Sequence, residues 1–382
     1  TPSYVENVKK LTGKQNYDSG SSLFFARVDA RAAARFAANP DGWLRDRRVS
    51  FNASGSYYPD IAADQQGNLH VVWADSRDGN SDIYYIKLSP SGNNLTSEIR
   101  LTMNPASSLA PVVAVDSNGY VHVVWHDYAY GALEIFYKKL DNNGLAVSPD
   151  IRVTQTASNS LNPTLGIDSQ NNVHIAWQED NNGYDIFYKK LNNNGINLTG
   201  NIPVINNMYP HSVNPSLAID KQDNIHVVWN EDYSNLYYAK LDSNGGMLVQ
   251  PKSLGNSGLY SSFGAPILAV DSHRDLHVLI SYNYVNYYPS LQYYHFNETG
   301  SSISPGYFPG AYNVYSYDVA TDSQDLIHFV WSKAENPGNQ GELYYAKMNQ
   351  TGNLVVPSTR LTFDPANSWA SSFILTNKGV HV

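Results

Sequence analysis

Short runs of alternating apolar and polar residues fill the chain, and turn-forming residues separate them. Residues 161–168 (LNPTLGID) alternate and lead into a turn over residues 168–172, after which residues 173–177 (VHIAW) are β-branched or aromatic. Residues 185–191 (DIFYKKL) form a third such run, and an Asn/Gly turn follows at residues 192–195. A fourth, short run comes after this turn and reads EIRLT at residues 98–102 of an earlier repeat. This pattern predicts units of four short β-strands.

The four-strand unit is a tandem repeat. An aspartate followed six residues later by a histidine recurs every 51 or 52 residues, and a tryptophan stands three residues after the histidine in five of the six copies. The pairs are Asp64/His70, Asp116/His122, Asp168/His174, Asp220/His226, Asp271/His277 and Asp322/His328, and the tryptophans are Trp73, Trp125, Trp177, Trp229 and Trp331. A period near fifty with four strands in each unit predicts an all-β fold, the β-propeller, with one four-stranded blade per repeat.

The two ends of the chain carry complementary fragments of a further repeat. Residues 371–382 match the first two strands, whereas residues 23–29 and 47–50 match the third and fourth. Six full blades in residues 51–368, with a closing blade shared between residues 23–50 and 369–382, predict a single seven-bladed β-propeller over residues 1–382. Pairing the two ends removes exposed sheet edges. Residues 1–22 have no counterpart in the repeat, and the alanine-rich residues 29–39 predict a short helix.

Composition excludes several classes of partner. The formal net charge of −9 argues against nucleic acid and anionic membranes. No stretch is apolar enough for a transmembrane helix, so membrane insertion is not expected. The chain has no cysteine, which excludes disulfides and thiolate metal sites.

Five Asn-x-Ser/Thr sequons suggest a glycoprotein. They are at Asn52, Asn94, Asn197, Asn297 and Asn349, and the last four fall at or just after the turn between the third and fourth strands. Chance matches are the alternative in a chain rich in asparagine. A chain that opens at Thr-Pro is compatible with a processed mature form. We therefore expect an extracellular or cell-surface location.

The repeat resembles a known family. Residues 116–125 (DSNGYVHVVW), followed by residues 134–140 (EIFYKKL), are similar to the sialidase-like propeller repeats of secreted and surface proteins in archaea and bacteria. In that family, sialidases bring three arginines together on the axis beside a Tyr/Glu nucleophile pair and an acidic residue. Here Arg48, Arg100, Arg152 and Arg360 share one position on the outermost strand, so they cannot converge on the axis. No catalytic residue is assigned from the resemblance.

The repeated residues favour structural roles. An aspartate in a turn can accept hydrogen bonds from backbone N–H groups or from the imidazole, and the tryptophan offers a large apolar surface between blades. Asp82, Glu134, Asp185 and Glu342 recur just before the third strand and are expected to cap loops. Copies that depart from the repeat are therefore the better candidates for function.

The fifth repeat departs most clearly. Ile280 replaces its tryptophan, and tyrosines crowd the following loops. Loops between the second and third strands and loops between blades emerge on one face of a propeller, so a ligand-binding aromatic face is a candidate site. Its members are Tyr282, Tyr284, Tyr287, Tyr288, Tyr307, Tyr312 and Tyr315. Tyrosine rings suit sugar rings and protein partners alike, and simple packing of an irregular blade is the alternative.

A second candidate site lies on the innermost strands. The residue after the proline position shares a strand face with small residues, and in three consecutive blades it is polar: Asp318, Ser372 and Asp60. Two carboxylates at a channel mouth can hold a polar ligand or a cation such as calcium, and a solvated channel lining is the alternative. No metal site or cofactor is assigned, with calcium left open. The loop at residues 75–82 resembles calcium loops without fitting the EF-hand spacing.

Two classes of function remain. The first is a non-enzymatic surface module that recognises a glycan or a protein through the tyrosine-rich face, within a homo- or hetero-assembly. The alternative is a glycoside hydrolase or lyase that acts in the propeller funnel. Its acid/base pair would need two carboxylates about 5 to 9.5 Å apart, and Asp60 and Asp318 are the candidate pair. The outer placement of the arginines favours the first class.

Overall fold

The computed structural model describes residues 24–25, 27–28, 47–50, 54–181, 183–205, 211–256, 261–284, 289–304, 312–334, 341–362, 372–376 and 379–382. The chain falls into two compact units. One contains residues 1–103, 109–111 and 312–382, and the other contains residues 104–108 and 112–311. Among the described residues, no helix is long and apolar enough to cross a membrane.

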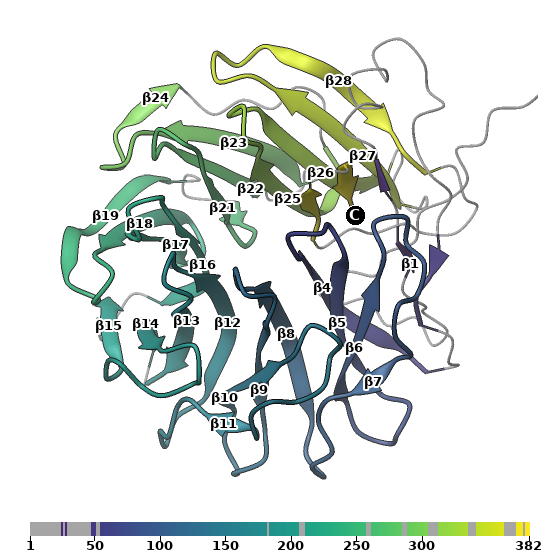
Figure 1. Ribbon diagram of the computed structural model, residues 1–382. Coiled ribbons are helices and arrows are strands. Elements are labelled where there is room, and N and C mark those ends of the chain that lie inside the picture. The colour runs from purple at the N-terminus through teal and green to yellow at the C-terminus, as the bar shows by residue number, and fades with distance from the viewer. Residues whose placement is uncertain are drawn as a thin grey trace, which may run out of the picture. The chain divides into compact units, whose positions relative to one another are not determined.

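The first unit contains two four-stranded antiparallel blades. Blade one orders β4 (Ser56–Ala63), β5 (Leu69–Asp75), β6 (Asp82–Leu88) and β7 (Ile99–Arg100), and blade six orders β25 (Val314–Thr321), β26 (Ile327–Ala334), β27 (Gly341–Met348) and β28 (Leu354–Arg360) (Figure 1). Strands from the two chain ends accompany them. β2 (Arg27–Val28) pairs with β30 (Gly379–His381), which pairs with β29 (Ile374–Thr376), and β1 (Phe24–Phe25) pairs with β3 (Arg47–Arg48).

The second unit contains four blades of the same kind. Blade two contains β8 (Ser108–Val115), β9 (Val121–Asp127), β10 (Glu134–Leu140) and β11 (Ile151–Arg152), and blade three contains β12 (Ser160–Ile167), β13 (Val173–Asp180), β14 (Tyr184–Leu191) and β15 (Ile202–Ile205). Blade four contains β16 (Ser212–Ile219), β17 (Ile225–Glu231), β18 (Asn235–Leu241) and β19 (Met247–Asn256). Blade five contains β20 (Ser261–Phe263), β21 (Ile267–Val270), β22 (Leu276–Tyr284), β23 (Ser290–Phe296) and β24 (Ser302–Ser304), with β20 and β21 pairing successively along β22.

The core lies between neighbouring blades. Most positions on the second and third strands of each blade are buried, and the five repeated tryptophans are covered almost completely. Trp229 of blade four, for example, packs in one cluster with Ala176 and Tyr188 of blade three. Such burial on both faces explains why these strands are continuous runs of β-branched and aromatic residues.

The prediction of an all-β propeller with four-stranded antiparallel blades is confirmed. The blade number differs from the predicted seven, because the described residues form six full blades. Chain-end strands do share one sheet, since Arg27 opposes His381 and Val28 opposes Val380. They are nevertheless divided between a three-stranded and a two-stranded sheet. Residues 29–39, predicted to be helical, lie outside the described residues.

Candidate functional site

The repeated aspartate and histidine belong to the internal structure of each blade. In blade three, Nε2 of His174 lies 3.0 Å from Oδ2 of Asp168, and Nδ1 lies 2.7 Å from the hydroxyl of Tyr188. Asp168 also accepts hydrogen bonds from backbone N–H groups in its own turn. Burial lowers the pKa of His174 despite the bond to Asp168, so the ring is neutral at pH 7. The histidine–tyrosine contact recurs in the other five full blades at 2.7 to 3.0 Å, which confirms the predicted structural role.

The repeated tryptophan makes a hydrogen bond that the repeat pattern did not predict. Nε1 of Trp229 donates to the carboxylate of Glu231 over 2.8 Å, and the Ser212 hydroxyl donates to the same carboxylate. Trp73, Trp125 and Trp177 make the equivalent bond to a carboxylate two residues further on. These carboxylates accept hydrogen bonds inside their own blades, so they are poor candidates for catalysis.

The outer-strand arginines pair with the carboxylates that precede the third strand. Arg100 lies 2.6 Å from Asp82, and Arg152 lies 2.6 Å from Glu134. Their predicted place on the outermost strand is confirmed by the pairing of β7 and β11 with the third strands. In the loop at residues 75–82, the Asp75 carboxylate is bound in the same way by Arg77.

The inner-strand position that carries Asp60, Asp318 and Ser372 links neighbouring blades. Thr164 and Ser216 occupy it in blades three and four, and their hydroxyl oxygens accept the N–H groups of Leu217 and Leu268 in the next blades. In blade six, Oδ2 of Asp318 accepts the N–H of Phe373 at 2.9 Å. This link between inner strands was not predicted.

Asp60 and Asp318 flank the same inner strand of the first unit. β29 lies against both β4, which carries Asp60, and β25, which carries Asp318. Both aspartates and Ser372 are half-buried. The strand register shifts before each aspartate, between Tyr57 and Asp60 and between Val314 and Ser316. Such shifts change the direction of side chains, and β-bulges of this kind are frequent beside active sites.

The predicted tyrosine face is described only in part. Tyr287, Tyr288 and Tyr307 and the side chain of Tyr284 lie outside the described residues. Tyr282 is half-buried and packs against the core of blade five. Tyr312 and Tyr315 are 62% and 47% exposed. These two rings are therefore available to a ligand.

Lys333 is a candidate ligand-binding residue that was not predicted from the repeat pattern. It stands two residues after Trp331, where blades one to four have an aspartate or glutamate. Its ammonium lies 4.5 Å from the ring centroid of Tyr344 and 5.7 Å from that of the exposed Tyr312. The exchange of an acid for a base at a repeated position was a readable signal in the sequence. It places a cation beside an exposed aromatic ring.

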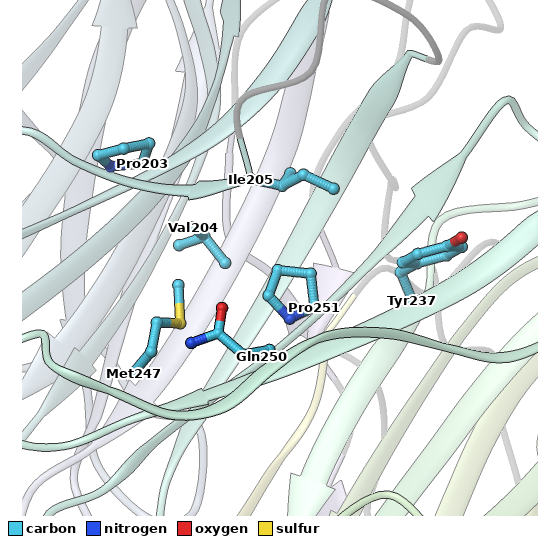
Figure 2. A pocket seen from close by; sticks show the side chains of 7 residues that line it. All are labelled: Pro203, Val204, Ile205, Tyr237, Met247, Gln250 and Pro251. Carbon is cyan, nitrogen blue, oxygen red and sulfur yellow. The ribbon is translucent and has the colours of Figure 1, made fainter.

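A shallow groove on the outer strands of blades three and four has a volume of about 470 Å³. Figure 2 shows its lining, which includes Val204, Tyr237, Met247 and Pro251. The lining has no ionisable acid or base apart from the tyrosine. It therefore offers no acid–base pair for catalysis.

Four of the five predicted glycosylation sites are described, and Asn52 is not. Asn94 and Asn197 are exposed at the outer edge of their blades. Asn297 and Asn349 are half-buried, and their side-chain oxygens accept bonds from the threonine two residues on. Glycosylation of all five stays a prediction.

Comparison with known proteins supports the fold. No protein-family model and no curated protein sequence matches the chain. Among solved structures, the α-L-arabinofuranosidase arb93a from Fusarium graminearum is 12% identical, with a TM-score of 0.54 over 78% of this chain and 93% of that one. The polysaccharide lyase Uly1 is 12% identical, with a TM-score of 0.53 over 94% of this chain and 96% of that one. A subtype N10 neuraminidase-like protein of A/little yellow-shouldered bat/Guatemala/060/2010 is 9% identical, with a TM-score of 0.51 over 73% and 89% of the two chains.

These similarities correct one expectation from the sequence. The primary expectation was a non-enzymatic module that binds a glycan or protein through the tyrosine face. Solved structures that share the fold include an arabinofuranosidase and a polysaccharide lyase, two carbohydrate-cleaving enzymes. The expectation of a non-enzymatic module is therefore wrong, and the hydrolase alternative is favoured. At 9 to 12% identity, the similarity itself is one of fold.

Proposed function

We propose that this protein is a glycoside hydrolase that uses Asp60 and Asp318. One observation carries the proposal: two half-buried carboxylates flank one inner strand, β29, on a fold that is shared with carbohydrate-cleaving enzymes. Hydrolysis of a glycosidic bond needs a pair of carboxyl groups, one to protonate the leaving oxygen and one to act as base or nucleophile.

The hydrogen bonds of Asp318 suggest how the two roles divide. Its Oδ1 accepts the N–H of Val319 at 2.8 Å and its Oδ2 accepts the N–H of Phe373 at 2.9 Å. Backbone donors of this kind stabilise the charged carboxylate, which suits the base or nucleophile. Asp60 is then the general acid. The backbone bonds also hold Asp318 in place, as a reacting group requires.

The exposed side chains of blade six support an acidic glycan as the substrate. Exposed Tyr312 and Tyr315 offer flat rings for sugar rings to pack on. Lys333 beside Tyr312 offers a cation for a sugar carboxylate. Uronic acids and sialic acids both carry such a carboxylate.

The test is activity against a panel of neutral and acidic glycans, with products identified by mass spectrometry. We expect new reducing ends from an acidic glycan, and a loss of at least about 1,000-fold in kcat/KM for Asp60→Asn and Asp318→Asn, because removal of a member of the carboxyl pair removes a step of the reaction. The amide introduced by Asp318→Asn keeps a side-chain oxygen for the N–H of Phe373, so the link between strands survives.

Thr164→Val and Ser216→Ala are matched controls. They remove the same link between inner strands in blades three and four without removing a carboxylate. Activity that falls as much in these variants as in Asp318→Asn would show a structural role for the position. An unsaturated product would identify a lyase and contradict the hydrolase. Absence of any cleavage across the panel would contradict the proposal altogether.

We also propose that the chain-end strands complete a seventh blade. The pairings β29–β30–β2 and β1–β3 supply the strands that one blade needs in the order that the repeat predicts. Deletion of residues 1–50 is expected to lower the thermal midpoint steeply, since it would remove β1, β2 and β3 from that blade and expose the edge of β30. An unchanged midpoint would contradict the shared blade.

We propose an extracellular location because the chain carries N-glycosylation sequons. Asn94 and Asn197 are exposed, as glycosylation requires. Secretion from a eukaryotic cell line is expected to give a protein whose mass falls on treatment with a glycosidase specific for N-linked glycans. Asn94→Gln and Asn197→Gln should each remove part of that mass difference. No mass difference would contradict glycosylation of these sites.

A further inference from the structure

Blade five departs from the repeat at two positions beside its buried Asp271. On the third strand, a lysine stands in the other five full blades, at residues 87, 139, 190, 240 and 347, but His295 stands in blade five. In the turn, blades one, three and four have an asparagine at residues 68, 172 and 224, but blade five has Asp275. Both changes fall on the groups that contact the repeated aspartate.

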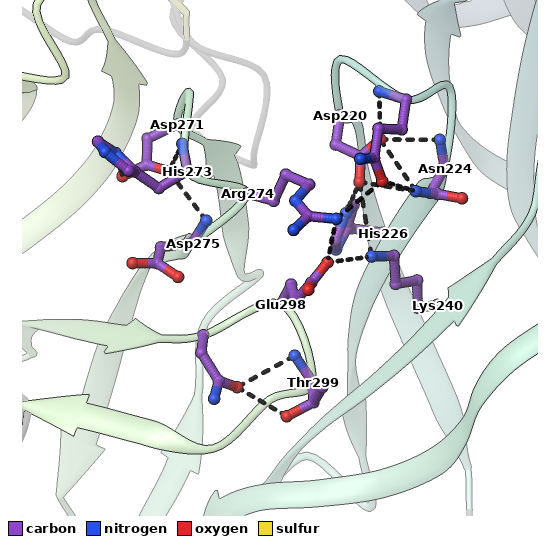
Figure 3. Close-up of polar contacts among 12 residues, drawn as sticks. Asp220, Asn224, His226, Lys240, Asp271, His273, Arg274, Asp275, Glu298 and Thr299 are labelled. Atoms are coloured by element: carbon purple, nitrogen blue, oxygen red, sulfur yellow. Dashed lines mark hydrogen bonds and ion pairs between the residues drawn. The ribbon is translucent and has the colours of Figure 1, made fainter.

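Blade four shows what these groups do in the regular repeat (Figure 3). Lys240 lies 3.5 Å from Oδ2 of Asp220, and Nδ2 of Asn224 donates to the same oxygen at 2.9 Å. Lys240 also pairs with Glu298 at 2.7 Å. The buried Asp220 therefore has a cation and an amide donor beside it, in addition to His226.

Blade five has different side chains at both of these positions. Oδ2 of Asp271 lies 3.3 Å from Nε2 of His277, and Oδ2 of Asp275 lies 3.5 Å from Nε2 of His295. The rings of His277 and His295 stack with centroids 4.7 Å apart. Blade five keeps the aspartate and the histidine, but His295 replaces the lysine and Asp275 replaces the asparagine. The exchange removes a positive charge and adds a negative one, so the cluster favours a bound cation.

His295 gives the second indication of a bound ion. It is only 4% exposed, and its Nε2 lies 3.5 Å from Asp275 without forming a hydrogen bond to any of the described residues. Buried polar atoms are nearly always hydrogen-bonded, and exceptions call for an explanation such as an ion. The donor atoms of Asp271, His277 and His295 all lie within 4.8 Å of one another.

We propose that Asp271, His277 and His295 bind a divalent transition-metal ion, with zinc as the best match, and that Asp275 supplies the remaining negative charge. Imidazole and carboxylate are the ligands of zinc, at about 2.0 to 2.2 Å. Calcium prefers oxygen ligands only, so two imidazoles disfavour it.

The ion would reinforce the blade that lacks the usual internal bonds. Ile280 and Tyr282 replace the tryptophan and the carboxylate that join strands in blades one to four. Asp271 follows β21, His277 lies on β22 and His295 lies on β23, so one ion would join three segments of blade five. Half-exposed Asp275 and exposed His273 give the ion a path from solvent.

The site is tested by measuring zinc binding to the full chain after removal of metals with a chelator. We expect one zinc ion per chain by elemental mass spectrometry and a rise in the thermal midpoint on adding zinc. A cobalt-loaded sample should show the visible absorption of a tetrahedral site. Calcium and magnesium should leave the midpoint unchanged.

His295→Lys and Asp275→Asn are the informative variants, because each restores a residue that the regular blades carry. His295→Lys is expected to lower zinc affinity at least about 100-fold and Asp275→Asn about 10-fold, while both keep the metal-free midpoint at or above that of the wild type. His273→Ala changes an exposed neighbour of the site and is the control. This variant should still bind one zinc ion per chain.

Three results would overturn the proposal. The first is a metal-free wild type with no midpoint shift in excess zinc. The second is unchanged zinc affinity in His295→Lys. The third is tighter binding of calcium than of zinc.

Discussion

Blade four and blade five have the same strand pairing and the same buried Asp–His–Tyr contact, yet they stabilise it differently. Blade four surrounds Asp220 with Lys240 and Asn224 and joins Trp229 to Glu231. Blade five places Asp275 and His295 beside Asp271, and Ile280 stands where the tryptophan would be. The repeated residues hold the blade together, and the replaced ones mark where a copy has acquired another property.

The largest expected effect is at the tryptophan that distinguishes the two blades. Trp229→Ala is expected to lower the free energy of unfolding by about 4 kcal/mol, because a buried ring leaves a cavity and Glu231 loses a donor. Ile280→Val at the equivalent site should cost about 1 kcal/mol. Chemical denaturation measures both. Equal costs would contradict the larger cavity and the lost hydrogen bond expected for Trp229→Ala.

Transplanting the blade-five cluster into blade four sharpens the comparison. Asn224→Asp with Lys240→His is expected to cost about 2 kcal/mol without metal, since Asp220 and Glu298 lose the ammonium between them. Zinc should restore the stability of the double variant. It should stabilise the single variant Lys240→His less. Thermal unfolding with and without zinc measures the difference. A loss that zinc leaves unchanged would show that the blade-five geometry is special to that blade.

Acid should destabilise blades four and five, because each contains a buried histidine with a lowered pKa. Burial, ahead of all other causes, lowers the pKa of His226 and of His295 below 6.5. A lowered histidine pKa stabilises the fold above pH 6.5, and this contribution is lost as the pH falls towards the folded-state pKa. His295→Lys removes one such group, so its metal-free stability should fall less between pH 7 and pH 5 than that of the wild type. Parallel pH profiles would contradict this.

The smallest effect is expected at the exposed contact between the two blades. Arg274 of blade five lies 3.0 Å from Glu298 and donates to Gln222 of blade four over 2.7 Å. Exposed pairs contribute about 0.2 to 1 kcal/mol and are screened by salt. Arg274→Ala should therefore cost less than about 1 kcal/mol, and less still at high salt, in denaturation experiments.

The period of aspartate, histidine and tryptophan was enough to predict the four strands and the buried role of these residues. Side-chain directions beyond the bulges were not predictable, because positive-φ residues such as Tyr58 and Asn162 shift the register locally. The exchanges at His295 and Asp275 were visible in the aligned repeats, but only the structure shows that His295 lies beside Asp271 and His277. Lys333 could also have been found by aligning the repeats.

The pairing of β2 with β30 joins strands from opposite ends of the sequence. During synthesis, β2 leaves the ribosome long before β30 exists, and the blades between them can form first from contacts that are local in the chain. We therefore expect this sheet to form after the blades that lie between its strands in the sequence, because it closes a loop of several hundred residues. Until it forms, the newly made chain carries unpaired strand edges that chaperones can recognise.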